Sequence, residues 1–130
     1  MEARYIATLS AACAAFLATG CAVTTQITRE EAGPYPENYK EIIASYIKSS
    51  FKDPYSLKDV MISKPMPYKI LHRAGYVVCL QTNAKNSYGG YVGISHNEIM
   101  IEGQKVWGTG NDYCYQRGGL EPWPEMEGKK

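Results

Sequence analysis

The feature that most limits how this chain can fold is an apolar stretch at its start. Residues 5–18 carry no charged side chain and are rich in alanine, and Arg4 lies just ahead of them. A membrane-spanning helix needs about 20 apolar residues, so the stretch is better suited to the core of a cleavable export signal. We therefore expect residues 1–20 to be removed, which leaves about 110 residues, enough for one domain.

The stretch ends with Leu-Ala-Thr-Gly-Cys at residues 17–21, which resembles the lipobox of bacterial lipoproteins. In that family the cysteine receives a diacylglyceryl group, the signal is cut just before it, and the new amino terminus is acylated. The resemblance implies that Cys21 carries two or three acyl chains such as palmitate, enough for stable membrane attachment. An ordinary secretory cut after Gly20 and an uncleaved membrane anchor remain as alternatives.

The residues after the cysteine indicate where the mature chain is held. Many enteric lipoproteins with aspartate directly after the cysteine stay in the inner membrane, so Ala22 implies the outer membrane, facing the periplasm. Residues 21–34 are mostly polar and show no helical or strand period, which predicts a solvated tether between the lipid and the domain.

The clearest periodic pattern is helical. Apolar side chains recur every three or four residues from Tyr39 to Phe51, with charged side chains mainly on the other side. Pro36 suits the first turn of this helix, and Asp53-Pro54 ends it because the residue before proline avoids helical angles. Such a helix must bury its apolar stripe against the rest of the chain.

The segments that follow favour an antiparallel sheet. Strands are expected at residues 57–64, 76–81, 88–95, 98–101 and 104–107. Pro65 and Pro67 interrupt the first, and turns are expected at residues 83–87, 96–97 and 102–103. The sequence thus predicts an α+β fold over residues 35–116, with one N-terminal amphipathic helix packed on a four- or five-stranded antiparallel meander. Residues 117–130 form an extended C-terminal tail, from which Leu120 and Trp123 could dock on the core or on a partner.

The cysteine count is consistent with lipidation. Of four cysteines, Cys13 leaves with the signal and Cys21 is taken by the lipid, so Cys79 and Cys114 are left to form a disulfide. That bond closes a loop of about 36 residues and stabilises the fold by roughly 3.5 kcal/mol in the chain-entropy model. A redox-active pair is the less favoured reading, since there is no Cys-x-x-Cys motif.

Charge and composition exclude several classes of function. The 14 basic and 13 acidic residues are well mixed and give a net charge of +1, which argues against a nucleic-acid partner. The two histidines, His72 and His96, have no acidic or cysteine neighbours at ligand spacing, so no metal site is expected. No phosphate-binding loop is present and no cofactor is expected.

The densest group of unusual residues predicts a binding surface. Its members are Asn83, Lys85, Asn86, Tyr88, Gly89, Gly90 and Tyr91. The Asn-Ala-Lys-Asn-x-Tyr-Gly-Gly-Tyr segment, with Asp53-Pro54 and Cys79 upstream, resembles small uncharacterised proteobacterial envelope lipoproteins, which implies a shared domain and no particular activity. The alternative is structural: the asparagines satisfy their own turn and Gly89-Gly90 form a bulge.

Together these features predict a non-enzymatic binding or structural module of the cell envelope. Its partners would be the membrane, through the lipid anchor, and an envelope protein or glycan, through the exposed segment. Two alternatives remain open, an inhibitor of a hydrolase and a cell-wall-directed enzyme, and the latter requires a cleft with converging acid and base groups.

Overall fold

The computed structural model of the chain describes residues 27–110 and 119–128. The export signal, the lipidation site Cys21 and the disulfide partner Cys114 lie outside these residues and stay predictions. Among the residues that are described, no helix is both long enough and apolar enough to cross a membrane.

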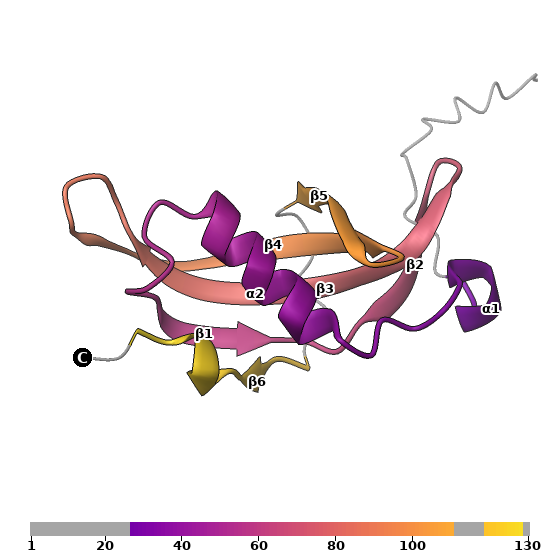
Figure 1. The fold of residues 1–130 in the computed structure, drawn as a ribbon, viewed down its shortest axis with the longest axis horizontal. Helices are drawn as coiled ribbons and strands as arrows, with labels where there is room; N and C mark the ends of the chain where they lie inside the picture. Colours follow the sequence, from indigo (N-terminus) through magenta and orange to yellow (C-terminus); the bar gives the residue numbers. More distant parts are fainter. Residues whose placement is uncertain (1–26, 111–118, 129–130) are drawn as a thin grey trace, which may run out of the picture.

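The described residues form a mixed α+β domain, in which two helices accompany one antiparallel six-stranded sheet (Figure 1). The predicted fold class, a largely meandering antiparallel sheet with a helix packed on it, is confirmed. The strands lie in the order β5-β4-β3-β1-β6, and β2 also pairs with β3. The elements are α1 (Arg29–Ala32), α2 (Tyr39–Ser50), β1 (Lys58–Ile62), β2 (Met66–Ile70), β3 (Arg73–Lys85), β4 (Tyr91–Glu102), β5 (Lys105–Gly110), β6 (Glu121–Pro122) and the 3₁₀ turn η1 (Pro124–Met126).

Helix α2 follows the predicted helical pattern and covers one face of the sheet. Its Ile43 and Ile47 are fully buried, and they pack in one cluster with side chains of β1, β3 and β4. Each buried aliphatic side chain contributes about 1.5–3 kcal/mol, so this stripe attaches the helix to the sheet. The helix ends at Phe51, whose backbone N–H donates to the carbonyl of Ile47 at 3.0 Å.

Strand β3 is the centre of the sheet. It pairs with β1 and β2 along one edge and with β4 along the other, and its residues 76–80 are all buried. Gly75 is required here, because a Cβ atom at that position would collide with the carbonyl oxygen of Ile101. Its 13 residues span about 40 Å, and α1 and the β2–β3 turn lie at the opposite end of the molecule from the β3–β4 loop (Figure 1).

Two expectations about the strands were wrong. Strand β2 forms despite Pro67, because among the described strands it pairs with β3 alone, and a strand at the edge of a sheet tolerates proline. The turn expected at residues 96–97 does not exist. Strand β4 continues through His96 and Asn97, because β3 extends beside them and pairs with both, through Gln81 and Leu80.

Turns at both ends of β4 are also displaced from their predicted positions. Asn83 and Lys85 still belong to β3, so the loop falls at residues 86–90 rather than 83–87. The next turn contains Gly103 and Gln104, one residue later than expected, with Gly103 at φ +62°. Glycine adopts this left-handed backbone without strain, which fixes the turn there.

A short stretch of the predicted tether is helical. The single turn α1 is closed by a capping box, in which Thr28 Oγ1 accepts from the Glu31 N–H at 3.3 Å and the Glu31 carboxylate accepts from the Thr28 N–H at 2.9 Å. The Thr28 N–H and the Thr28 hydroxyl both donate to the Glu31 carboxylate, and these two hydrogen bonds hold the pKa of Glu31 below its ordinary value. The spacing of Thr28 and Glu31 is a recognised signal for a helix start, and the polar composition of the segment hid it.

The described part of the predicted tail packs on the domain, which is one of the two alternatives considered for Trp123 from the sequence. Strand β6 pairs with β1, and Trp123 is only 4% exposed and lies in the main core cluster. The Trp123 N–H donates to the carbonyl of Val60 at 2.8 Å, and the Gly128 N–H donates to that of Leu57 at 2.8 Å. Residues 119–128 therefore belong to the folded body.

Replacing Trp123 by alanine should lower the free energy of unfolding by about 3–5 kcal/mol, because it leaves a cavity under α2. Urea denaturation followed by far-UV circular dichroism measures the change. The control is Tyr88→Ala at a ring that is 97% exposed, where we expect a change below about 0.5 kcal/mol. Equal stability of the two variants would contradict the placement of Trp123.

Candidate binding surface at the β3–β4 hairpin

The structure brings all seven residues of the predicted binding surface to one hairpin. We call residues 83–94 the hairpin tip: the end of β3, the loop at residues 86–90 and the start of β4. The tip forms one end of the long axis of the molecule (Figure 1). Its residues divide into those that hold the backbone and those that face outward.

Asn86 holds the loop together. Its side-chain Oδ1 accepts from the N–H of Tyr88 at 2.9 Å and from that of Gly90 at 3.1 Å. Its own N–H donates to the Gly90 carbonyl at 2.8 Å, and Gly89 adopts φ +81°, which favours glycine. The structural alternative considered from the sequence is therefore correct for Asn86, and the loop is locally rigid.

Asn83 has a similar role three residues before the loop. Its Oδ1 accepts from the Gly93 N–H at 3.0 Å, and its Nδ2 donates to Asp59 Oδ2 at 3.3 Å. The strand pairing shifts between Asn83 and Lys85, so the bulge lies at residues 92–93 of β4 and not at Gly89-Gly90. Gly93 has φ +95°, consistent with its place in the bulge.

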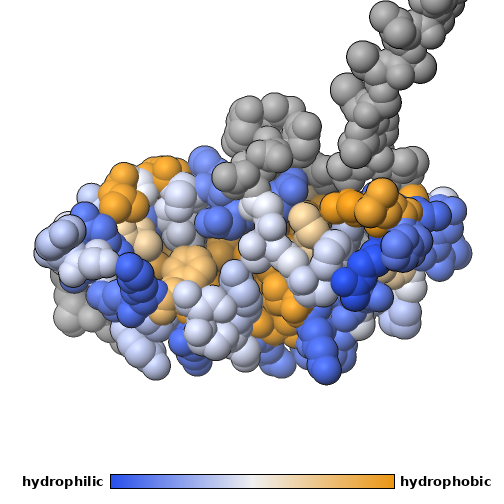
Figure 2. All heavy atoms as spheres, turned by 90° about the horizontal axis from the view of Figure 1, so that it is seen from above, coloured by the Kyte–Doolittle hydropathy of each residue, from blue (hydrophilic) through white to orange (hydrophobic). Residues whose placement is uncertain are grey.

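The outward side chains of the tip are apolar or aromatic. Tyr88 is 97% exposed, Val92 63% and Ile94 52%. Apolar side chains are visible at both ends of the molecule in the space-filling view (Figure 2). Clustered exposed apolar groups on a small domain mark a site of interaction, whereas single ones need no explanation.

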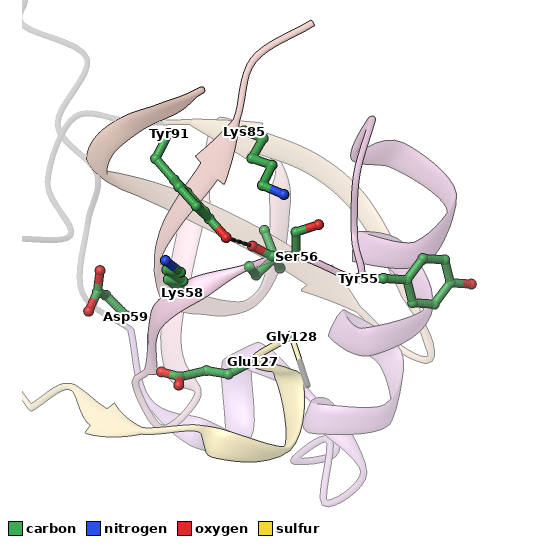
Figure 3. A pocket seen from close by; sticks show the side chains of 9 residues that line it. Tyr55, Ser56, Lys58, Asp59, Lys85, Tyr91, Glu127 and Gly128 are labelled. Atoms are coloured by element: carbon green, nitrogen blue, oxygen red, sulfur yellow. Dashed lines mark hydrogen bonds between the residues drawn. The ribbon is translucent and has the colours of Figure 1, made fainter. Parts of the chain in front are cut away.

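Tyr91 is held against the body of the domain and flanked by two lysines (Figure 3). Its hydroxyl donates to the carbonyl of Ser56 at 2.9 Å. Lys58 Nζ lies 4.2 Å and Lys85 Nζ 5.4 Å from the centre of the ring, both within cation–π range. The ring is thus locked in place and positions both ammonium groups.

A hollow of about 400 Å³ lies beside Tyr91. It is lined by residues 55–59, Lys85, Tyr91, Glu127 and Gly128. Its two carboxylates maintain the fold: Asp59 accepts from Asn83, and Glu127 Oε1 accepts from the Val60 N–H at 3.1 Å. Within residues 27–110 and 119–128, neither Lys58 nor Lys85 forms an ion pair.

A third lysine reaches the tip from the segment after α2. Lys52 Nζ donates to Ser87 Oγ at 2.7 Å. Three ammonium groups and one carboxylate, that of Asp59, therefore contact residues 83–94 among the contacts described. The tip combines an apolar surface with a net positive rim.

The sequence missed four members of this surface. Val92 and Ile94 were assigned to a strand and gave no sign that their stretch of β4 would be left uncovered. Lys52 and Lys58 are distant from the tip in sequence, and only the fold brings them next to it.

The two histidines lie apart in the structure. His72 lies in the β2–β3 turn, and His96 Nε2 lies 3.0 Å from Gln81 Oε1 in the middle of the sheet.

The described residues include many of the possible metal ligands and one of the two cysteines predicted to form the disulfide. There, no cluster of three or more His, Cys, Asp or Glu side chains is arranged to hold a metal ion. Cys79 is fully buried and disulfide-bonded. Its pairing with Cys114 remains a prediction, because Cys114 is outside the description.

Comparison with protein-family models, with curated proteins and with solved structures finds no match to this chain. The resemblances to lipoproteins and to small envelope proteins therefore stay predictions from the sequence. The candidate surface rests on its own geometry.

A second aromatic cluster lies toward the other end of the sheet. Tyr68 of β2 stacks on Trp107 of β5 with ring centres 6.3 Å apart, and Trp107 Nε1 donates to the Tyr68 hydroxyl. Arg73 lies 4.5 Å from the centre of the Trp107 ring and pairs with Glu102 at 3.0 Å. Burial raises the pKa of Tyr68 to about 12.

The raised pKa of Tyr68 predicts a loss of stability in strong base. The unfolded phenol ionises near pH 10, so the stabilisation is fully present below about pH 10 and is lost as pH rises toward about 12. Urea denaturation at intervals across this range should show a decline that is shallower in Tyr68→Phe by roughly 2 kcal/mol in total. Tyr88→Phe should follow the wild type; an unchanged slope in Tyr68→Phe would contradict the assignment.

Asn86→Ala should loosen the loop, because the amides of Tyr88 and Gly90 lose their acceptor. We expect these two amides to exchange with solvent about ten times faster, for a local stability loss of about 1 kcal/mol. Hydrogen exchange by NMR measures this directly. Asn86→Asp keeps the acceptor oxygen and should retain the protection; equal loss in both variants would show that the side-chain oxygen is unimportant.

Proposed function

We propose that this chain is a lipid-anchored protein of the bacterial cell envelope, held in the outer membrane through Cys21, and that it binds a protein partner through the hairpin tip. The observation that carries the binding proposal is the presentation of Tyr88 on a loop fixed by Asn86. The anchor rests on the lipobox-like sequence that ends at Cys21.

The tip has the properties of a preformed recognition element. Association becomes less favourable when loops and side chains must be ordered on binding. Here Asn86 and Asn83 already satisfy the backbone of the loop and of the bulge. Tyrosine adds a large amphipathic contact with few rotatable bonds, which is why it is common among the residues that dominate binding energies.

The chemistry of the tip indicates the kind of surface it fits. Tyr88, Val92 and Ile94 are exposed apolar anchors. Lys52 contacts Ser87 of the same tip, and Lys58 and Lys85 contact Tyr91. A partner with an apolar pocket and an acidic rim would bury the anchors and pair with the ammonium groups. Such a surface is typical of a protein partner rather than a nucleic acid.

The position of the tip in the fold supports this role. The described chain begins at α1, which contacts β2 and β3, at the end of the long axis opposite the tip (Figure 1). A chain held by Cys21 would therefore keep its tip about 40 Å from the point of entry. The tip is free to face away from the membrane toward a partner.

An inhibitor of a hydrolase is the second candidate. A narrow, rigid hairpin with a protruding ring can enter the cleft of an enzyme, and the fixed loop at Asn86 favours this reading. Assays of cell-wall hydrolases and proteases with wild type and Tyr88→Ala separate the two: inhibition that depends on Tyr88 identifies the partner as an enzyme.

Tyr88→Ala should weaken partner binding about 30-fold, because truncating a central aromatic anchor costs at least about 2 kcal/mol. The measurement is quantitative recovery of the partner after cross-linking in intact envelopes, followed by titration with the purified partner. Tyr55→Ala is the matched control, since Tyr55 is also a highly exposed tyrosine, at 76%, and lies outside the tip. The same loss in both variants, or none in Tyr88→Ala with the fold intact, would refute the role of the tip.

A further inference from the structure

The β2–β3 turn combines two properties that are unfavourable for a turn exposed to water. Leu71 is 81% exposed and has φ +54°. A left-handed backbone favours glycine or asparagine over leucine. A leucine side chain that stays exposed to water also adds no hydrophobic stabilisation to the fold. A bulky apolar side chain is therefore displayed at the very end of a two-residue hairpin, at a position where turn chemistry does not favour it.

Basic and aromatic side chains lie near Leu71, together with the carboxylate of Glu102. Lys69 and His72 are exposed, and Arg73 is about half exposed while it pairs with Glu102. Trp107 lies under the Arg73 guanidinium. Leu71 is apolar, Lys69 and Arg73 are cationic, and Trp107 has an amphipathic ring. A phospholipid surface offers acyl chains, phosphates and a headgroup boundary that suit these three kinds of side chain.

The route of the chain brings this turn to the same place as the anchor. Helix α1 contacts β2 and β3. The positive charge of Lys69 contributes to the lowered pKa of Glu31. The Tyr76 hydroxyl donates to the Gly33 carbonyl at 2.8 Å. Only five residues, 22–26, separate Cys21 from the described chain, so Cys21 lies within about 20 Å of Ile27, two residues before α1. Figure 1 shows α1 and the β2–β3 turn at one end of the molecule.

We propose that the β2–β3 turn is a membrane-contact site, with Leu71 entering the headgroup boundary of the phospholipid bilayer that holds the anchor and Lys69 and Arg73 meeting lipid phosphates. This inference rests on the proposed lipid anchor. The tether keeps the turn at high effective concentration next to the bilayer, so a weak contact is sufficient to orient the domain. The contact orients the long axis of the domain away from the bilayer surface, with the hairpin tip at the end farther from the membrane.

Tryptophan fluorescence in a bilayer tests the orientation. The mature lipidated protein, purified from membranes, is reconstituted in vesicles made of an equal mixture of phosphatidylethanolamine and brominated phosphatidylglycerol. Leu71→Trp should lose about half of its added emission to bromine quenching, because the turn enters the headgroup boundary. Tyr88→Trp, at the far end of the molecule, is the matched reporter and should keep its emission. Wild-type protein supplies the background from Trp107 and Trp123.

A second pair of variants tests the phosphate contact. Lys69→Gln in the Leu71→Trp background should reduce the quenching, whereas Lys64→Gln, at an exposed lysine between β1 and β2, should leave it unchanged. Unchanged quenching in Lys69→Gln would overturn the role of that lysine. His72→Trp provides a second reporter in the turn if Leu71→Trp does not fold, as judged by circular dichroism.

The outcomes separate the contact from the anchor. Equal or stronger quenching at position 88 than at position 71, with lipid on Cys21 shown by the intact mass, would overturn the membrane contact and leave the anchor standing. A mass that shows Cys21 without lipid would remove the anchor, and the orientation inferred from it would fall as well.

Discussion

The burial of strand β3 is the constraint on which the rest of the structure depends. Its residues 76–80 are buried, and it pairs with β1 and β2 along one edge and with β4 along the other. Without it, α2 would have no face on which to bury Ile43 and Ile47, and β1, β2 and β4 would lose their common partner. Its length also sets the span of the molecule, since α1 and the β2–β3 turn lie at one end and the hairpin tip at the other.

The core cluster lies on one face of the sheet and does not include the outward side chains of the hairpin tip. Helix α2 and Trp123 lie over the middle of the sheet, where Ile99 and Ile101 of β4 are buried. Toward the tip the same strand continues with exposed Val92 and Ile94. Ile94 pairs with Asn83, whereas Ile99 and Ile101 pair with Val78 and Tyr76. Ile94 therefore lies on the opposite face of the sheet and does not join the cluster on which α2 packs.

Polar residues at the tip have two separate roles that composition alone could not distinguish. Asn83 and Asn86 use their side chains on nearby backbone groups, whereas Lys58 and Lys85 lie against Tyr91. The sequence predicted a turn close to this loop because turn chemistry is local: an Asn-Gly-rich segment between two apolar runs marks a hairpin loop. The sequence could not show which asparagine side chains would accept hydrogen bonds from the loop backbone, since that depends on hydrogen-bond geometry.

The sequence by itself determined the features that depend on interactions between residues close together in the chain. The helical period from Tyr39 to Phe51, the strand composition around Val77 and the glycine-rich loop fixed the α+β class and the place of the hairpin. Only the tertiary structure decided the pairing of β2 despite Pro67, the unbroken course of β4 through His96 and the burial of Trp123. Each of these depends on a partner far away in the chain, and the free energy of such a contact is absent from any local pattern.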